Sequence, residues 1–344
     1  MNLEPHEINP GILDQGKLTP KVSIGIPVFN GGKTLARTIE SILCQDYKNI
    51  EIIISDNAST DDTRVVSEKY QEKDSRILYF RQESNIGMFE NFNEVFRLSS
   101  GEFFMWAAHD DEHASNFISS CLRYLFVDPN AALCAPITKA VLDGEINWTA
   151  GLNSFNNKKD LLKRYRETLR NFPAVAIYGI YRSSMVRKTR MWQKFMGADM
   201  VFVQELSLYG TFLAHNEILF TYYERGDWNT VDQDFANVYG KQKKPWYYSP
   251  FLIILFNQIS IVVFCDHILS AKFRLLSVLF RFQFSKIVLK INLKMVKYLV
   301  PKRFKLFLAN FIYWRFMHSP NIEVKNGLGY SHRNVRPMVG LRDE

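Results

Sequence analysis

Short, nearly all-apolar segments alternate with amphipathic segments along the first 140 residues of the chain. Runs such as 51–55 are too short for a buried helix and are typical of strands in a sheet covered on both faces. Between these runs, apolar residues recur every three or four positions, which indicates helices. The predicted strands are 21–27, 51–55, 77–80, 103–107 and 131–137. The predicted helices are about 33–44, one that ends near 73, one that ends near 98, and 115–126. This order predicts an α/β fold with a Rossmann-like, mostly parallel sheet flanked by helices.

The pattern is less regular elsewhere. Residues 138–170 are more polar, and we predict irregular structure there apart from a basic helix near 158–170. An apolar helix is predicted to begin at Asp199. Residues 1–20 are polar and lack an apolar segment, so we expect a loose N-terminal extension.

Composition favours a globular protein of a reducing compartment. With 344 residues and 47% hydrophobic content, the chain can form a large core or two domains. Its four cysteines, at 44, 121, 134 and 265, have neither metal-site nor redox spacing. We therefore expect free thiols and a cytoplasmic location.

The charge is concentrated near the C-terminus. Residues 241–320 contain 14 Lys and Arg but one acid, Asp266, whereas the whole chain carries a net charge of +8. The remaining residues are therefore mildly acidic. A basic, apolar region attached to an acidic body indicates an anionic surface as partner.

The apolar residues of this basic region are arranged as in helices that lie on a bilayer. The uncharged stretch between Lys244 and Asp266 is interrupted by prolines and amides, so we interpret it as an interfacial or packed helix rather than a membrane span. Four lysines share one helical stripe, at 286, 290, 294 and 297. We predict membrane association for 241–320, with packing on the rest of the chain or on a second subunit as the alternative. Nucleic acid is not expected, because apolar residues separate the lysines.

One candidate site follows the predicted strand 103–107. The apolar run ends at His109, Asp110, Asp111 and Glu112. Adjacent ionised carboxylates repel each other unless a cation lies between them, and a divalent metal such as Mg²⁺ or Mn²⁺ is the usual one. Alternatively, Asp110 or Asp111 could cap the helix that begins near Ser115.

Other candidate residues also follow strands. Strands ending at Pro27, Ser55 and Ala107 bring Phe29, Asn30, Asp56 and the carboxylate pair toward one crevice, because ligands bind at the carboxyl ends of parallel strands. This architecture is typical of nucleotide-binding proteins. The chain lacks both the dinucleotide and the P-loop glycine motifs, so a diphosphate would be neutralised by a metal and basic side chains.

These motifs resemble the family 2 glycosyltransferases, which have the GT-A fold. The resemblance rests on VSIGIPVFNGGKTLARTIESILCQDYKNIEIIISDNASTDDT, on NIGMFENFNEVF and on the carboxylate pair, and covers roughly 21–225. It implies that Phe29, in the turn from Pro27 to Asn30, stacks on the nucleotide base and that Asp56 contacts the base. It implies that Asp110 and Asp111 bind the ribose, the diphosphate and the metal. His109 stands where the family often has the first Asp of its motif.

The resemblance also implies a catalytic base. Asp199, in Gly197-Ala-Asp199, is similar to the family carboxylate that deprotonates the acceptor, although an N-cap role is the alternative. Arg225 corresponds to a basic position near the diphosphate. Tyr178 and Arg182 lie on a segment similar to the family's acceptor-side strand, where core packing is the alternative. The Q-x-x-R-W motif of processive synthases is missing.

The sequence thus predicts a peripheral enzyme at the inner face of the cell membrane. It would transfer one sugar, with inversion and a divalent metal, from a nucleotide-diphosphate sugar to a glycan or lipid-linked acceptor in cell-surface polysaccharide or glycoconjugate synthesis. Homo-oligomers are possible. The predicted domains are 1–20, the GT-A domain 21–240 (donor half 21–137, acceptor half 138–240), the amphipathic region 241–320 and a tail 321–344. The alternatives are a degenerate nucleotide-sugar-binding protein and a non-enzymatic membrane assembly module.

Overall fold

The first half of the chain forms four parallel strands connected by helices. The structure is a computed structural model that describes residues 19–152, 155, 160–224, 249–283 and 322–323. Strands and helices alternate as predicted, in the order β1 Val22–Val28, α1 Leu35–Leu43, β2 Ile50–Asp56, α2 Thr63–Lys73, β3 Ile77–Arg81, α3 Met88–Arg97 and β4 Phe103–Trp106. Their order in the sheet is β3-β2-β1-β4. The predicted α/β class is confirmed.

The second half extends the same sheet with strands of both directions. Its elements are β5 Glu112–His113, α4 Phe117–Val127, β6 Ala131–Leu142, β7 Glu145–Ala150, α5 Leu161–Asn171, the 3-10 helix η4 Ala174–Tyr178, β8 Ile180–Arg182, α6 Ser183–Val186, α7 Ala198–Leu206 and β9 Thr211–Tyr223. β8 lies antiparallel between β4 and β6, and β6 runs parallel to β9. The short β10, Ile322–Glu323, pairs with β7.

The prediction of irregular structure after residue 137 is wrong for residues 138–150. β6 continues to Leu142 and turns into β7. The turn residues Asp143 and Gly144 both have positive φ, at 51° and 86°, as a two-residue hairpin turn of type I′ requires. Farther along, the segment that carries Tyr178 and Arg182 is divided between η4 and β8.

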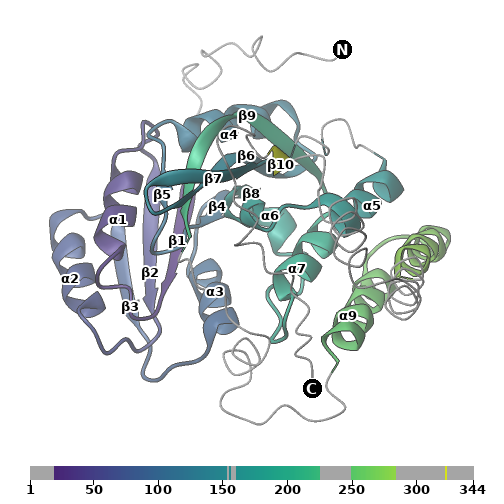
Figure 1. The fold of residues 1–344 in the computed structure, drawn as a ribbon, viewed down its shortest axis with the longest axis horizontal. Coiled ribbons are helices and arrows are strands. Elements are labelled where there is room, and N and C mark those ends of the chain that lie inside the picture. Colours follow the sequence, from purple (N-terminus) through teal and green to yellow (C-terminus); the bar gives the residue numbers. More distant parts are fainter. Residues whose placement is uncertain (1–18, 153–154, 156–159, 225–248, 284–321, 324–344) are drawn as a thin grey trace, which may run out of the picture.

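Apolar side chains alternate between the two faces of the sheet and form two cores. On one face, residues such as Ile24, Ile52 and Met105 pack against α1 and α4. On the other face, Phe104 and Trp106 pack with α3 and α7. The ribbon shows α1 and α2 at one end of the sheet and the later helices at the other (Figure 1). The carboxyl ends of β1, β2 and β4 therefore lie at one edge between rigid layers.

Two helices follow the sheet, and the first of them packs on α7. α9, Pro250–Phe264, buries Gln258, Ile261 and Val262, and the following helical segment, 269–283, buries Leu275 and Leu279. None of the described helices is long and apolar enough to cross a membrane. The predicted lysine stripe at 286, 290, 294 and 297 lies outside the described residues.

Candidate active site

The turn after β1 is fixed to the loop after β2 by hydrogen bonds. Asn30, at a positive φ of 53°, donates its backbone N–H to the Ser59 hydroxyl (2.8 Å), and its side-chain oxygen accepts from the Thr60 N–H (2.9 Å). The neighbouring Gly31 N–H donates to the hydroxyl of Thr63 (2.9 Å). These bonds leave the Phe29 ring on the outside of the turn, 46% exposed. Phe29 is thus available for stacking on a flat ligand.

Pro27 lies in the last part of β1, which is paired on one side only. β1 pairs with β2 through Pro27 and Val28, but its pairing with β4 ends at Gly25. A proline has no N–H to donate and is therefore tolerated where the ladder has ended. Pro27 is buried and supports the turn that carries Phe29 and Asn30.

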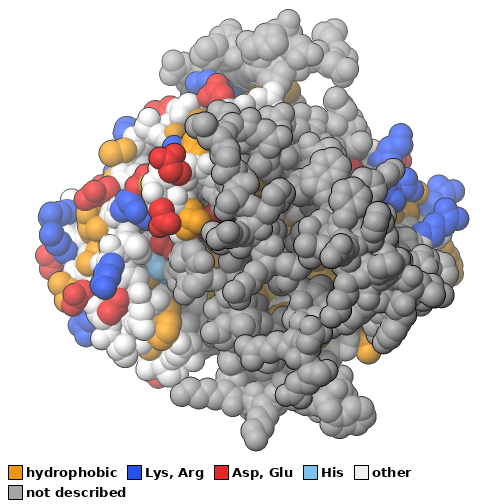
Figure 2. Space-filling view, viewed as in Figure 1, with side chains coloured by type: hydrophobic (Ala, Val, Ile, Leu, Met, Phe, Trp, Pro, Cys, Tyr) orange, Lys and Arg blue, Asp and Glu red, His pale blue; other side chains and the backbone are white. Residues whose placement is uncertain are grey.

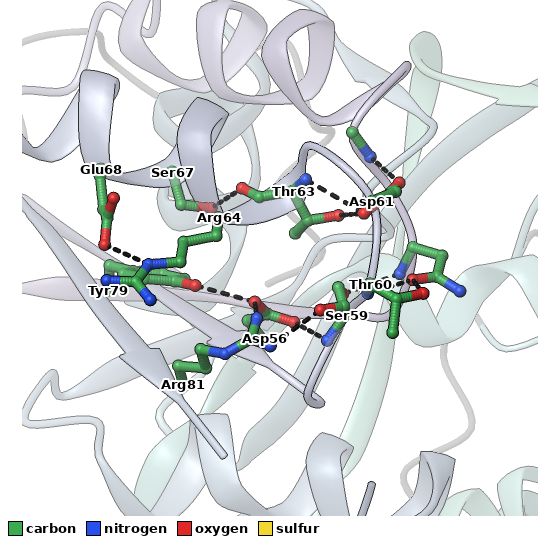
Figure 3. Close-up of polar contacts among 12 residues, drawn as sticks. Asp56, Ser59, Thr60, Asp61, Thr63, Arg64, Ser67, Glu68, Tyr79 and Arg81 are labelled. Carbon is green, nitrogen blue, oxygen red and sulfur yellow. Dashed lines mark hydrogen bonds and ion pairs between the residues drawn. The ribbon is translucent and has the colours of Figure 1, made fainter. Parts of the chain in front are cut away.

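The Asp56 carboxylate is fully buried at the end of β2 and accepts several hydrogen bonds. It accepts from the Ser59 N–H (2.8 Å), the Tyr79 hydroxyl (2.8 Å) and the Arg81 guanidinium (2.7 Å), as Figure 3 shows. Burial and the Asp56 charge raise the pKa of Tyr79 to about 12, so Tyr79 remains a donor. Arg81 is the partly exposed charge of this cluster and had not been anticipated from sequence.

We expect Arg81→Met to lower the free energy of unfolding. The substitution leaves a buried carboxylate without its cation, and the partial exposure of Arg81 makes the loss smaller than for a fully buried pair. Arg64→Gln is the matched control, because the Arg64–Glu68 pair in the same view is exposed on both sides and should contribute much less. Urea unfolding measures both; equal losses would contradict this account of Asp56.

Asp110 and Asp111 lie between β4 and β5, where several groups hold their backbone. Thr38 donates its hydroxyl to the Asp111 carbonyl (2.8 Å), and the Arg37 guanidinium donates to the Asp110 carbonyl. The side chain of Asp111 is buried, and its Oδ1 accepts from the Tyr223 N–H (3.0 Å) at the end of β9. The capping alternative is wrong, because α4 is capped at Asn116. The pair therefore lies on a loop that hydrogen bonds hold in place, and neither residue caps a helix.

Arg37 and Glu112 brace the outside of this loop. Arg37 pairs with Glu112 (3.3 Å) and its guanidinium lies 3.9 Å from the centre of the Tyr223 ring. The Tyr223 hydroxyl donates to Glu112 (3.0 Å), which closes the network. This network could not be predicted from local sequence patterns, because its members come from α1, β5 and β9.

The two histidines near the pair have structural positions. His109 lies against the first turn: its Nδ1 is 3.1 Å from the Thr34 hydroxyl, and a Cβ on Gly31 would come within 2.9 Å of that nitrogen. His113 is packed between the rings of Phe117 and Phe220, and burial lowers its pKa to about 3. His113 is therefore neutral at physiological pH and belongs to the core beneath the loop.

Asp199 occupies the first turn of α7. The N-cap is Gly197, in the left-handed region at φ 85°, so the capping alternative for Asp199 is wrong. Burial raises the pKa of Asp199, although the amides of Met200 and Asp199 itself partly oppose the shift. A carboxylate with a raised pKa is suited to accepting a proton near neutral pH.

Tyr178 is influenced both by the carboxylate pair Asp110–Asp111 and by Asp199. Its hydroxyl is buried, which raises its pKa, and the nearby charges of Asp111, Asp110 and Asp199 raise it further. Its ring packs on Phe220, 5.4 Å between centres. Three carboxylates from two separate parts of the chain thus influence the pKa of one phenol.

Comparison with known proteins identifies the family. Residues 23–190 match the model of "Glycosyl transferase family 2". This segment is a family 2 glycosyltransferase domain. The domain is 29% identical, over 52% of this chain and 57% of the relative, to the GalNAc(5)-diNAcBac-PP-undecaprenol beta-1,3-glucosyltransferase of Campylobacter jejuni. It is 38% identical to an uncharacterised glycosyltransferase of Rickettsia typhi over 33% of this chain and 34% of that protein. The chain thus spans between a third and three fifths of the length of these relatives.

Solved structures agree on the GT-A fold. The S. aureus TarS 1–349 structure in complex with UDP-GlcNAc has a TM-score of 0.58 and 18% identity, and the match covers 77% of this chain and 73% of TarS 1–349. The UDP complex of the same protein has a TM-score of 0.56 and 17% identity, and that match covers 75% of this chain and 70% of the other. At these identities the likeness establishes the fold of the family 2 domain.

The carboxylates of the family 2 domain fit a divalent metal whose coordination is completed by the substrate and water. Within the described ranges, no group of three or more His, Cys, Asp and Glu side chains is arranged to hold a metal. Mg²⁺ and Mn²⁺ bound with nucleotides commonly take one or two protein carboxylates, and phosphate oxygens and water supply the rest. Asp110 and Asp111 supply that number of carboxylates. Their negative charge raises the pKa of Tyr178.

The remaining predicted residues are Arg225 and Arg182. Arg225 lies outside the described residues. Arg182 donates to the carbonyls of Leu125 (2.8 Å) and Ala131 (3.2 Å) and covers the Phe103 ring, so it ties β8 to α4 and β6. The packing alternative therefore accounts for Arg182 in the family 2 domain. All four cysteines are free thiols, as predicted.

Proposed function

We propose that the protein transfers a single sugar from a nucleotide-diphosphate sugar to a hydroxyl group of a glycan or lipid-linked acceptor. The observation that carries this proposal is that Phe29, the Asp56 cluster and the pair Asp110–Asp111 follow the parallel strands β1, β2 and β4 at one edge of the sheet. Asp199 and the carboxylate pair both raise the pKa of Tyr178, which supports placing the base near that edge. One side of such a site can hold a metal and a diphosphate, and the other side can accept a proton. Sugar transfer by displacement requires both functions at one centre.

On the donor side, the base would stack on Phe29 and contact the Asp56 cluster. Asn30 would hold the turn in place through its bonds to the loop after β2, and Pro27 would support the turn from the end of β1. Asp110 and Asp111 would bind Mg²⁺ or Mn²⁺, which when bound neutralises the diphosphate leaving group. Arg225 would add a positive charge to the same diphosphate.

On the acceptor side, Asp199 would remove the proton of the attacking hydroxyl. The acceptor oxygen bonds to the anomeric carbon as the bond from that carbon to the diphosphate oxygen breaks, and the proton passes to the Asp199 carboxylate. Attack from the face opposite the leaving group inverts the configuration. Tyr178, kept protonated by its raised pKa, would orient the substrate by donating a hydrogen bond.

We propose the acceptor and the cellular location of the protein from the name of one relative and from the positive charge of residues 241–320. The Campylobacter jejuni relative is named for an undecaprenol-diphosphate-linked acceptor. A lipid-linked acceptor would bring this protein to the inner face of the cell membrane, in cell-surface polysaccharide or glycoconjugate synthesis. The basic composition of residues 241–320 supports that placement.

The test is a thermal-shift panel of UDP-, GDP- and dTDP-sugars with and without Mn²⁺, followed by transfer assays with the donor that stabilises most. We expect one nucleotide class to raise Tm strongly and Mn²⁺ to increase that shift. Phe29→Ala should weaken binding of this donor roughly 5- to 150-fold, since stacking on a base contributes about 1–3 kcal/mol.

Phe80→Ala is the matched control, because Phe80 is a similarly exposed aromatic residue on β3. It should leave donor affinity unchanged. Equal effects of the two substitutions would contradict the stacking role. If the protein binds the donor but shows neither sugar transfer nor slow donor hydrolysis, it is a degenerate nucleotide-sugar-binding protein. The sequence argument for that alternative is His109, which stands where the family often has an Asp.

A further inference from the structure

Three arginines from two helices border one cavity away from the active site. Arg166 and Arg170 lie one turn apart on α5, and Arg281 lies on the helical segment 269–283. With Val278 and Phe282 they line a cavity of about 290 Å³. Figure 2 shows Lys and Arg side chains gathered at the right edge of the molecule, where Figure 1 places α5 and the last described helix.

No carboxylate of the described residues neutralises these arginines. The ion pairs of the described chain involve other arginines, and the nearby Glu167 accepts a hydrogen bond from Asn171. Like charges around one cavity repel each other, and an anion between them removes the repulsion. Guanidinium groups bind phosphate oxygens through paired N–H donors, so the cavity is chemically suited to a phosphate group.

An apolar ridge runs beside the arginine cavity. Leu269, Phe273 and Phe280 lie on one face of the segment 269–283, and Arg274 and Arg281 follow them along the next face. α9 repeats the pattern with Leu252, Phe256 and Val263, four and seven residues apart. Together with Phe264 and Ile268 at the turn, these large apolar side chains are 43–76% exposed. Such a density of exposed apolar residues marks an interaction surface.

The apolar ridge is connected rigidly to the proposed base. Buried glutamines form a hydrogen-bonded ladder from α7 to the ridge: Gln258 donates to Gln204 (2.9 Å), and Gln283 donates to Gln258 (2.6 Å). Arg190 adds a bond to Ser260 of α9 (2.8 Å) and pairs with Glu205 of α7 (3.2 Å). α7 also carries Asp199, so whatever the ridge contacts is held at a fixed position relative to the active site.

We propose that the ridge of α9 and 269–283 docks on a bilayer and that the cavity of Arg166, Arg170 and Arg281 receives the phosphate of an anionic phospholipid. Apolar faces bordered by cations are the composition of helices lying in a membrane interface. A second copy of the chain is a poorer occupant, because a two-fold interface would bring the two arginine groups together. The proposal gives a location to the lipid-linked acceptor of the proposed function, and its test requires neither donor nor acceptor.

The test is co-sedimentation of the full chain with phosphatidylcholine vesicles that contain about one third phosphatidylglycerol, compared with pure phosphatidylcholine. Wild type should partition more strongly to the anionic vesicles. The triple variant Arg166→Gln, Arg170→Gln, Arg281→Gln should lose about 10²-fold, since each cation near an anionic leaflet contributes roughly fivefold. The variant Phe256→Ser, Phe264→Ser, Phe273→Ser should lose binding to both vesicles.

The matched control removes three charges from the opposite end of the molecule: Arg64→Gln, Lys69→Gln, Lys73→Gln on α2. It should lose much less than the arginine-cavity variant. Equal losses, or wild-type partition of the cavity variant, would overturn the phosphate site, and inhibition of vesicle binding by soluble phosphate at constant ionic strength would support it. If the serine variant changes the oligomeric state but not partition, the ridge is a subunit interface. Donor thermal shifts, which should be retained by every variant, report separately on the proposed function.

Discussion

Replacing Asp199 by Asn is expected to lower kcat by about 10²- to 10⁴-fold, the range that general-base catalysis contributes, while donor affinity is retained. Asn has the same shape but cannot take the proton of the acceptor hydroxyl. Because burial raises the pKa of Asp199, the wild-type rate should fall on the acid side of a pKa above 3.8, and the variant should lose that acid limb. Steady-state kinetics across pH, with donor thermal shifts, measure these effects.

The same substitution should stabilise the protein at neutral pH. An Asp whose folded pKa is raised costs stability as pH rises above its unfolded pKa, and Asn carries no such penalty. Glu205→Gln, on the same helix, is the control for loss of a carboxylate near α7: it breaks a pair with Arg190 and should change kcat little. Normal turnover by Asp199→Asn would exclude Asp199 as the base.

Replacing Asp111 by Asn is expected to remove metal-dependent donor binding and to lower kcat/KM by more than about 10²-fold, since a metal contributes several kcal/mol to charge stabilisation. The Asn oxygen can still accept from the Tyr223 N–H, so the loop between β4 and β5 should keep its position. The measurement is the Mn²⁺-dependent part of the donor thermal shift, which requires no turnover.

Glu112→Gln is the control for charge at this loop. Glu112 is the next residue, but it faces Arg37 and the Tyr223 hydroxyl rather than the Tyr178 region. Its loss should lower stability and leave the Mn²⁺ effect in place. A Mn²⁺ effect that survives in Asp111→Asn, or disappears equally in Glu112→Gln, would contradict the assignment of Asp111 to the metal.

The first half of the fold could be predicted because its strands are buried on both faces. Such strands are continuous apolar runs, and the candidate residues directly follow them, so Phe29, Asp56 and Asp110 reached one edge as expected. The hairpin of β6 and β7 was missed although Asp143-Gly144 is a recognised turn signal, because polar residues around it concealed the alternation.

The groups that hold the candidate residues could not be predicted. Arg81 reaches Asp56 because β3 pairs with β2 in a register that places them opposite each other, and sequence alone does not fix that register. Tyr223 meets Asp111 although 112 positions separate them. The local sequence pattern identifies candidate functional residues, whereas strand pairing between distant segments determines which side chains fix their positions.

The glutamine ladder between α7, α9 and the segment 269–283 has a geometric consequence. Amide pairs bond only in register, so these helices cannot slide past one another as purely apolar helices can. If the ridge rests on lipid, the ladder acts as a spacer of fixed length between the bilayer and Asp199. The reach of the enzyme would then be set by helix geometry, and acceptors whose hydroxyl lies at another height above the membrane would be excluded without any contact to their sugars.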